Sequence, residues 1–332
     1  MVNFEFIKPS QLYNTINQFL HYAFVNNPCY TILFDARIKE EYDEAHIVLA
    51  RRLKRDDYGD FVLPYGSELE CKWNIVVYDG NTETLKDKGD AVRAAKLLFN
   101  NGSRRSVKIL EGGYELFSRL YPFLRSQKIM YLPKELENFM CYPLEIIPNF
   151  LYIGSRVQAI DRKMHRELNI TAHVNCDVKE DPVYSDPQCA HYCRLSVNRY
   201  KFCDNGHSLV QWSETESPDL SIFMHEASDF IQQRRFEARR VLIISTHTIS
   251  RSVTIAIAYL IKYEAMTLKD AWKHLRNVCI PMRPSWKLMM QLAQFEANCR
   301  GLDTTKPLTE EEFYGKRLRG PLEPGSSTFA LV

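Results

Sequence analysis

The chain has 332 residues, enough for two domains of ordinary size that each bury a core. Hydrophobic residues make up 45% of it and charged residues 25%, which describes a folded globular protein and excludes a disordered or fibrous one. The formal net charge of +2 and the absence of a long uncharged apolar run exclude a global preference for nucleic acid and predict no membrane insertion.

The amino-terminal residues contain no basic segment followed by an apolar core, so we expect no secretory signal. They are also poor in arginine and include Glu5, so a mitochondrial presequence is not evident, although this leaves mitochondrial association open. The nine cysteines are an odd number scattered along the chain, which favours reduced thiols over a disulfide framework. We therefore expect a cytoplasmic protein.

The first third of the chain alternates between predicted strands and helices. Helices are expected at 9–24 and 90–100, and the segments 30–47, 74–81 and 107–124 each begin with a β-rich run. These segments, with Asp35-Ala36-Arg37, Ala45-His46-Ile47 and the Gly112-Gly113 turn, resemble a rhodanese-like domain. In the mitogen-activated-protein-kinase phosphatases this module precedes the catalytic domain, and the resemblance implies such a domain at residues 1–124.

A working sulfurtransferase would need a thiolate directly after the strand at 74–78. This chain has Asp79 there, which cannot carry a persulfide, and the nearest cysteine in sequence, Cys71, precedes the strand. The resemblance therefore implies a rhodanese fold without sulfur transfer.

A basic run lies between these predicted strands. Its four cations are Arg51, Arg52, Lys54 and Arg55, and the run resembles the docking segment with which kinase phosphatases hold an acidic groove of their kinase. Such a cluster raises association rates and makes affinity depend on salt. The alternative is a solvated loop, partly neutralised by Asp56 and Asp57.

The remaining blocks resemble the dual-specificity protein phosphatases. Segments 144–160 and 170–177 are similar to that family's first core strands, and 282–296 to its closing helix. The resemblance implies an α/β domain at 143–300 with a central, mostly parallel sheet flanked by helices. Residues 125–142 are expected to link the two domains, and 301–332 to form a flexible tail.

A polar loop between an apolar strand and an amphipathic helix carries the main site. A serine or cysteine, five residues and an arginine at the start of a helix form a phosphate cradle, because backbone N–H groups and the arginine face an anion. The candidate phosphate-binding residues are Ser245, Thr246, His247, Thr248, Ile249, Ser250, Arg251 and Ser252. Serine cannot replace the cradled thiolate as nucleophile, because its hydroxyl needs an adjacent base.

The sequence departs from the family pattern at the positions that carry out catalysis. Ile244 and Ser245 stand where the family has His-Cys, and Thr248 replaces a glycine of the loop. Arg199 stands where the family's aspartic general acid is expected, and Ser285 replaces an asparagine beside the closing helix. The resemblance, including this altered loop, is to the catalytically inactive pseudophosphatases of the family.

Two other interpretations apply to these residues. Ser245 with His247 as base would form a hydrolase pair. Ser245 or a water molecule with Asp204 as acid would instead give a weak residual phosphatase. A histidine and cysteine cluster between 189 and 207 could suggest zinc, but three of its members alternate along a predicted strand instead of curling around a metal. We therefore expect no metal and no cofactor.

The sequence thus predicts a regulatory binding protein in place of an enzyme. It would hold phosphoproteins at the phosphate loop, or dock on an active phosphatase or MAP kinase and change its activity.

Overall fold

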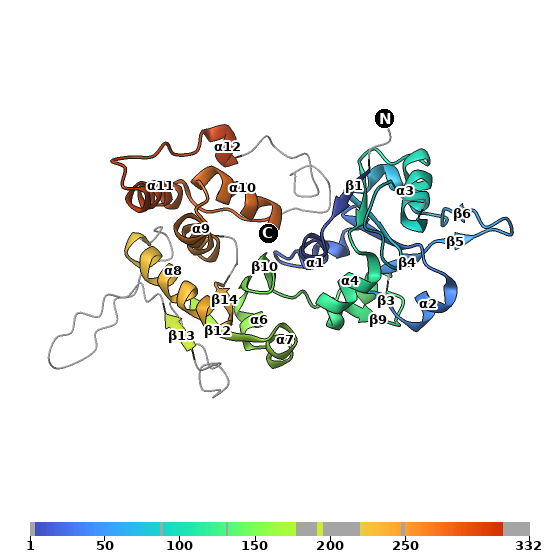
Figure 1. The fold of residues 1–332 in the computed structure, drawn as a ribbon, viewed down its shortest axis with the longest axis horizontal. Helices are drawn as coiled ribbons and strands as arrows, with labels where there is room; N and C mark the ends of the chain where they lie inside the picture. Colours follow the sequence, from blue (N-terminus) through green and yellow to red (C-terminus); the bar gives the residue numbers. More distant parts are fainter. Residues whose placement is uncertain are drawn as a thin grey trace. The chain divides into compact units, whose positions relative to one another are not determined.

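The computed structural model describes residues 4–86, 89–130, 132–176, 220–246 and 250–314, together with the backbone of 191–194. The described residues fall into two compact units that divide between Cys141 and Tyr142. Each unit is built around one sheet (Figure 1).

The first unit contains a five-stranded parallel sheet. Its order is β1 (Phe4–Ile7), β8 (Val107–Leu110), β7 (Asn74–Tyr78), β2 (Thr31–Asp35) and β4 (Ala50–Arg52). Two short antiparallel pairs accompany it: β3 (His46–Ile47) with β9 (Arg125–Ser126), and β5 (Lys54–Arg55) with β6 (Phe61–Val62). The strands end in line, as expected of parallel neighbours joined by helical crossovers.

Helices cover both faces of this sheet. They are α1 (Pro9–Ile16), α2 (Lys39–Glu44), α3 (Asp90–Asn100), α4 (Gly113–Leu120) and α5 (Pro133–Leu136), with 3₁₀ turns at Phe24–Asn26, Leu69–Cys71 and Pro122–Leu124. The small face of α3, with Ala91, Ala94 and Ala95, is completely buried against one side of the sheet. Short side chains there let the helix approach the strands closely.

Helix α1 is shorter than the 9–24 span that the sequence predicts. Asn17 Nδ2 donates to the carbonyl oxygen of Tyr13 at 2.8 Å, and Gln18 Nε2 donates to that of Asn14 at 3.0 Å. Gln18 Nε2 thus satisfies the Asn14 carbonyl group, while Asn17 Nδ2 is a second donor to a Tyr13 carbonyl that already accepts from the Asn17 N–H. The helix ends at Ile16.

Residues 125–141, which we expect to be a linker, fold within the first unit. Strand β9 pairs with β3, and Cys141 is buried among Ala23, Phe24, Val25 and Tyr30. The Cys141 thiol contacts the Gln18 carbonyl oxygen at 3.7 Å, and burial raises its pKa to about 12. The first unit therefore includes residues 125–141, up to the boundary between the two units.

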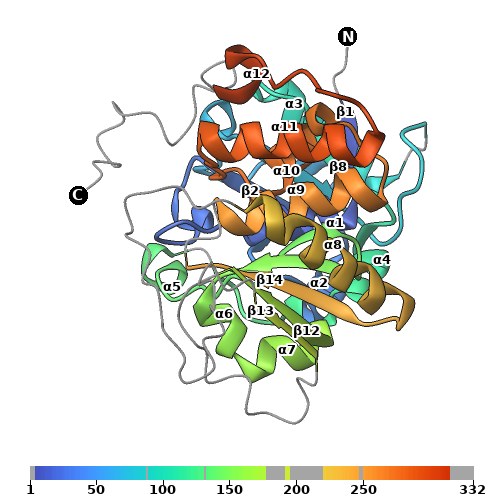
Figure 2. The same cartoon turned by 90° about the vertical axis from the view of Figure 1, so that its left-hand side faces the viewer.

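The second unit has a mostly parallel sheet. Its order is β10 (Leu144–Ile147), β11 (Leu151–Gly154), β14 (Arg240–Ile244), β12 (Ile170–Asn175) and β13 (His191–Arg194), and only the β10–β11 pair is antiparallel. Helices α6 (Arg156–Ile160) and α7 (Arg162–Leu168) lie on one side of the sheet (Figure 2).

Four longer helices pack on the other side (Figure 2): α8 (Ser221–Phe236), α9 (Arg251–Tyr263), α10 (Leu268–Val278) and α11 (Trp286–Arg300). Helix α9 contacts the other three and is buried all round from Ser252 to Ile261. A helix that is apolar on every face belongs in the centre of a core. The loop before α9 is therefore anchored to the most protected helix of this unit.

Residues 301–314, which we expect to belong to a flexible tail, contribute to this core. Leu308 and Phe313 are buried, and the Phe313 ring stacks on Trp272 and meets Trp286 edge-on. Phe313 belongs to α12 (Glu310–Tyr314), where Glu312 forms an ion pair with Lys269. The packed part of the second unit therefore continues beyond residue 300.

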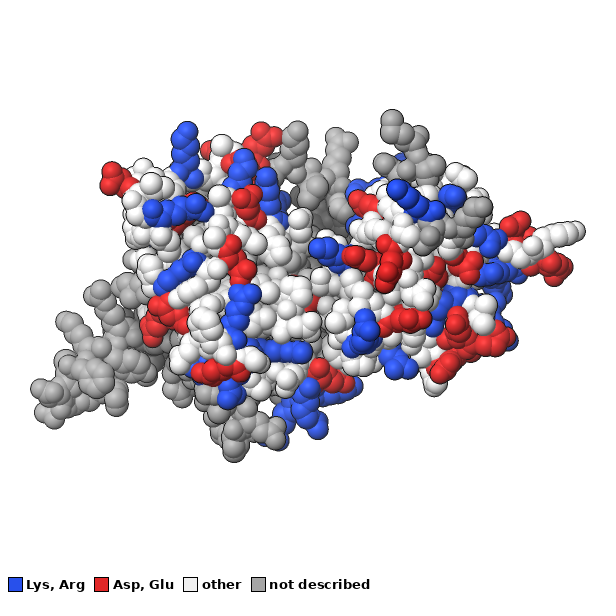
Figure 3. Space-filling model, viewed as in Figure 1, with Lys and Arg blue, Asp and Glu red and all other residues white. Residues whose placement is uncertain are grey.

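In the part of the chain that the structure describes, no helix has both the length and the apolar character required to span a membrane. On the face drawn in Figure 3, cationic and anionic side chains are interspersed.

Candidate functional site

The polar loop follows directly from the central strand of the second sheet. Ile244, the last residue of β14, lies between Gly154 of β11 and Asn175 of β12 in the register of the sheet. The Ser245 N–H donates to the Gly154 carbonyl oxygen at 3.2 Å, and the Cys176 N–H donates to that of Ile244 at 2.8 Å. Ser245 is thus fixed at the carboxyl edge of a parallel sheet, where α/β folds place their ligands.

The Ser245 side chain points into the base of the loop. It is 4% exposed, and its Oγ donates to the Ser252 Oγ at 2.9 Å. Ser252 is fully buried in the first turn of α9. A hydroxyl partner of this kind can orient Ser245, but it cannot remove its proton near neutral pH.

The first turn of α9 presents the features of an anion site. Ser250 occupies the N-cap position, yet its side chain makes no capping hydrogen bond. Serine is a preferred N-cap residue, and within the described residues its side chain does not take up the N–H groups of the first turn, which could then donate to an anion. Arg251 begins the helix and is half-buried, and α9 is 13 residues long, enough for a helix dipole that favours negative charge.

Other predicted site residues lie outside the described part of the chain: His247, Thr248, Ile249, Arg199 and Asp204. Thr246 is described and exposed. The described strand β13 contains His191 and Cys193, and its register with Ala172 and Val174 of β12 agrees with the predicted alternation. Among the described residues, no group of three or more His, Cys, Asp or Glu side chains could hold a metal ion.

Asp79 follows β7 in the first unit, at the predicted position, and its carboxylate is built into the loop. Its Oδ1 accepts from the Thr82 N–H at 2.9 Å, and its Oδ2 accepts from the Thr82 hydroxyl at 2.5 Å and from the Ala91 N–H at 3.0 Å. Ala91 lies in the first turn of α3, so Asp79 acts as a remote cap of that helix. The sequence analysis missed Thr82, although an aspartate three residues before a threonine is a common turn pattern.

Gly113 explains how the Asp79 loop meets the next helix. The residue has a φ of +53°, and a Cβ atom there would lie 2.5 Å from the Asp79 carbonyl oxygen. The same carbonyl accepts from the Tyr114 N–H at 2.8 Å. The loop after β7 therefore packs directly against the start of α4, which only glycine permits at this position.

The basic run divides between different environments. Arg51 and Arg52 are half-buried on the edge strand β4, and Lys54 is exposed on β5. Arg55 pairs with Asp90 at 2.5 Å and lies over the Phe61 ring. The structure therefore does not present the four cations as one exposed patch, and Lys54 and Arg55 are the exposed members.

Comparison with known proteins matches each unit to a different family. A model of the dual specificity phosphatase catalytic domain matches residues 151–298, and a model of the rhodanese-like domain matches residues 21–120. Both matches agree with the domain types that the sequence motifs predict.

Curated relatives match along most of the chain. Human dual specificity protein phosphatase 16 is 25% identical over 287 residues, covering 80% of this chain and 40% of that protein. Human dual specificity protein phosphatase 4 is 27% identical over 279 residues (75% and 66%), and tyrosine-protein phosphatase vhp-1 of Caenorhabditis elegans is 24% identical over 307 residues (81% and 44%). The chain therefore spans less than two thirds of the length of these relatives.

Among solved structures, human DUSP28 is 18% identical with a TM-score of 0.39, covering 48% of this chain and 98% of that one. The human tyrosine phosphatase-like serine/threonine/tyrosine-interacting protein is 18% identical with a TM-score of 0.38, covering 47% and 97%. The two family matches and the two sheets confirm the predicted fold class. The chain joins a rhodanese-like domain to a domain that is similar to the dual specificity phosphatase catalytic domain.

Proposed function

We propose that this protein is a catalytically inactive phosphatase, a pseudophosphatase, that acts by binding. The observation that carries the proposal is that a serine, Ser245, stands at the start of the loop. Its buried hydroxyl donates a hydrogen bond to the hydroxyl of Ser252 in the first turn of α9. The enzymes of the matched family use a cysteine thiolate there. The Ser252 hydroxyl is too weak a base to make a nucleophile of its partner.

Phosphate binding can persist without the nucleophile, because binding and cleavage depend on different atoms of the loop. An anion would be held by Arg251 and by the N–H groups at the start of α9, which the Ser250 side chain does not cap. The helix itself is fixed by the core of the domain. Replacing cysteine by serine at the base of the loop changes neither of these supports, so a phosphorylated side chain could be held without being cleaved.

The rhodanese-like domain supports the same proposal. The Asp79 carboxylate accepts three hydrogen bonds within its own loop and helix, so it acts as a structural group where a sulfurtransferase would have a reactive thiol. We propose that this domain serves as a docking module for an active phosphatase or a MAP kinase. Lys54, an exposed cation of the basic run, would contact an acidic surface of the partner.

Isothermal titration of the full chain with phosphotyrosine and phosphothreonine peptides tests the phosphate-holding form. We expect binding that Arg251→Ala abolishes and that Arg166→Ala, which removes an exposed arginine of α7, leaves intact. Binding that is equally strong in Arg251→Ala would contradict a role for the loop. If neither peptide gives heat, the loop does not hold phosphate, and the proposed function reduces to docking on a partner enzyme.

A phosphatase assay of the double variant Ile244→His, Ser245→Cys tests whether only the reagent is missing. We expect measurable hydrolysis from this variant and none from the natural chain. The assay needs a reductant, because Cys176 follows the neighbouring strand beside the new thiol. Hydrolysis by the natural chain that Ser245→Ala or Asp204→Asn removes would instead establish a weak residual phosphatase.

A further inference from the structure

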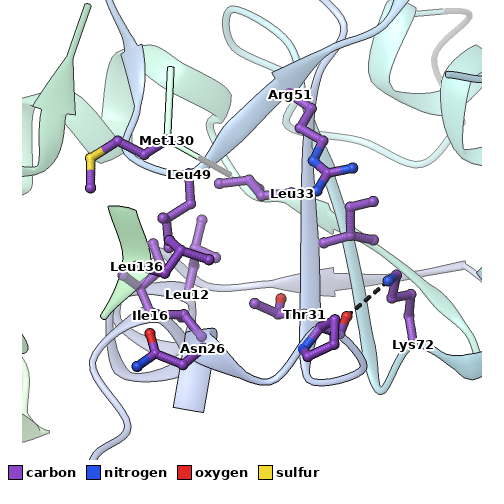
Figure 4. Close-up of a pocket in the computed structure, with 13 residues that line it drawn as sticks. Leu12, Ile16, Asn26, Thr31, Leu33, Leu49, Arg51, Lys72, Met130 and Leu136 are labelled. Carbon is purple, nitrogen blue, oxygen red and sulfur yellow. Dashed lines mark hydrogen bonds between the residues drawn. The ribbon is translucent and has the colours of Figure 1, made fainter. Parts of the chain in front are cut away.

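The first domain contains a cavity away from both degenerate loops. It has a volume of about 130 Å³ and lies between α1, the β2 and β4 strands, and α5 (Figure 4). Apolar side chains make up most of its wall, among them Leu12, Ile16, Leu33, Leu49 and Leu136. A dry cavity of similar size accepts benzene, so there is room for an apolar group of about six heavy atoms.

Two cations lie on one side of this cavity, Arg51 from β4 and Lys72 from the segment before β7 (Figure 4). The residues that line it include no aspartate or glutamate. Lys72 is only 8% exposed, and its Nζ donates to the Pro28 carbonyl oxygen at 2.8 Å. Within the described part of the domain, no carboxylate pairs with this ammonium group. A buried cation is costly without an anion, so a negatively charged ligand would stabilise Lys72.

The backbone of one wall residue is strained. Leu49 has a φ of +72°, in the left-handed region that residues other than glycine seldom adopt. The conformation costs about 1 to 2 kcal/mol and places the leucine side chain over the cavity. Strain of this kind clusters at ligand-binding positions, which gives the cavity a second feature of a built site.

We propose that this cavity binds a small organic acid. A branched or cyclic body of about six heavy atoms would fill the apolar part, and the carboxylate would lie against Lys72 and Arg51. Lys72 would then gain the counter-ion that the described residues do not provide. The ligand class follows from the shape and the charge together, because an apolar wall selects the body and two cations select the acid. This site is independent of the function proposed for the phosphate loop.

To test the proposal, the full chain is labelled at its leucine and isoleucine methyl groups and titrated with 4-methylpentanoate, and the methyl signals are observed by NMR. We expect saturable shifts of the Leu33, Leu49 and Ile16 signals up to about 10 mM acid, the range open to ligands of this size. The isosteric alcohol, 4-methylpentan-1-ol, should bind at least about tenfold more weakly, because it lacks the charge-assisted hydrogen bonds.

Three variants decide the role of the cation. Lys72→Met should abolish the preference for acid over alcohol, and Lys72→Arg, which keeps the charge, should retain it even if the methionine variant does not fold. Lys96→Met removes an exposed lysine of α3 and should bind as the natural chain does. No saturable shift, equal binding of acid and alcohol, or an unchanged preference in folded Lys72→Met would each overturn the proposal.

Discussion

Arg37 holds a buried ion pair in the first domain, and removing it should be strongly destabilising. Its Nη2 lies 2.7 Å from Asp35 Oδ2, and its Nε lies 3.1 Å from Asp35 Oδ1. Nη2 also donates to the Ala45 carbonyl oxygen at 2.8 Å, and the guanidinium lies 3.7 Å from the centre of the Tyr114 ring. Asp35 is completely buried, so Arg37→Ala would leave an uncompensated carboxylate in the core.

The magnitude follows from this burial. Breaking a buried ion pair by removing one partner costs about 3 to 5 kcal/mol, because the remaining charge cannot recover its hydration. The neighbouring Tyr78 hydroxyl stays neutral, because burial and then Asp35 raise the Tyr78 pKa well above its usual value, and it brings no positive charge to Asp35. For a domain of this size the loss corresponds to a fall in Tm of roughly 10 to 20 °C.

Scanning calorimetry of the full chain measures this effect, with Arg55→Ala as the matched control. Arg55 also pairs with an aspartate, at 2.5 Å, but its side chain is 31% exposed and that of Asp90 is 35% exposed. Exposed pairs contribute about 0 to 1 kcal/mol, so the control should lower Tm by only a few degrees. Equal shifts for the two variants would refute the reasoning from burial.

Three further predictions concern other residues. Burial, and then a neighbouring histidine, lower the pKa of His173 to about 3. Below pH 6.5 the unfolded state therefore binds more protons than the folded state, and the free energy of unfolding of the second domain should fall by about 2 kcal/mol between pH 7 and pH 5. In denaturant unfolding, His173→Leu should remove most of this pH dependence. Asp79→Cys should place a thiol against two N–H groups, and its alkylation should show a pKa below about 8.5, in contrast to Cys71, whose pKa is raised by burial and its surroundings. Gly113→Ala should destabilise by about 2 to 4 kcal/mol, because the new Cβ would meet a carbonyl oxygen, whereas Gly59→Ala, also at positive φ but in open space, should cost about 1 kcal/mol in the same assay.

The fold could be predicted where apolar runs are long and clearly bounded. The strands that end at Asp35, Tyr78 and Ile244, and the helix at 90–100, agree with the structure because their periodicity is a local property. The early end of α1 was not predictable in the same way, since side-chain amides bond the last carbonyl groups of this helix and periodicity does not show such bonds.

The environments of the candidate site residues were less predictable, because they depend on residues far away in sequence. Asp79 reaches Ala91 twelve positions later, and Arg55 finds Asp90 thirty-five positions later. The cavity is lined by Leu12, Lys72 and Leu136, which lie far apart in the sequence and which no local pattern joins. The chemistry at Ser245, by contrast, could be inferred from residue types alone, since a hydroxyl in place of a thiol needs no geometry to be a poorer nucleophile.

The central claim is that the loop from Ser245 to Arg251 holds phosphate without cleaving it. One ³¹P NMR experiment on the full chain with a phosphotyrosine peptide observes both properties together. We expect the peptide resonance to shift or broaden on binding, the effect to vanish in Arg251→Ala, and no signal of inorganic phosphate to develop. A growing inorganic phosphate signal that Ser245→Ala abolishes would contradict the claim and make the protein an enzyme.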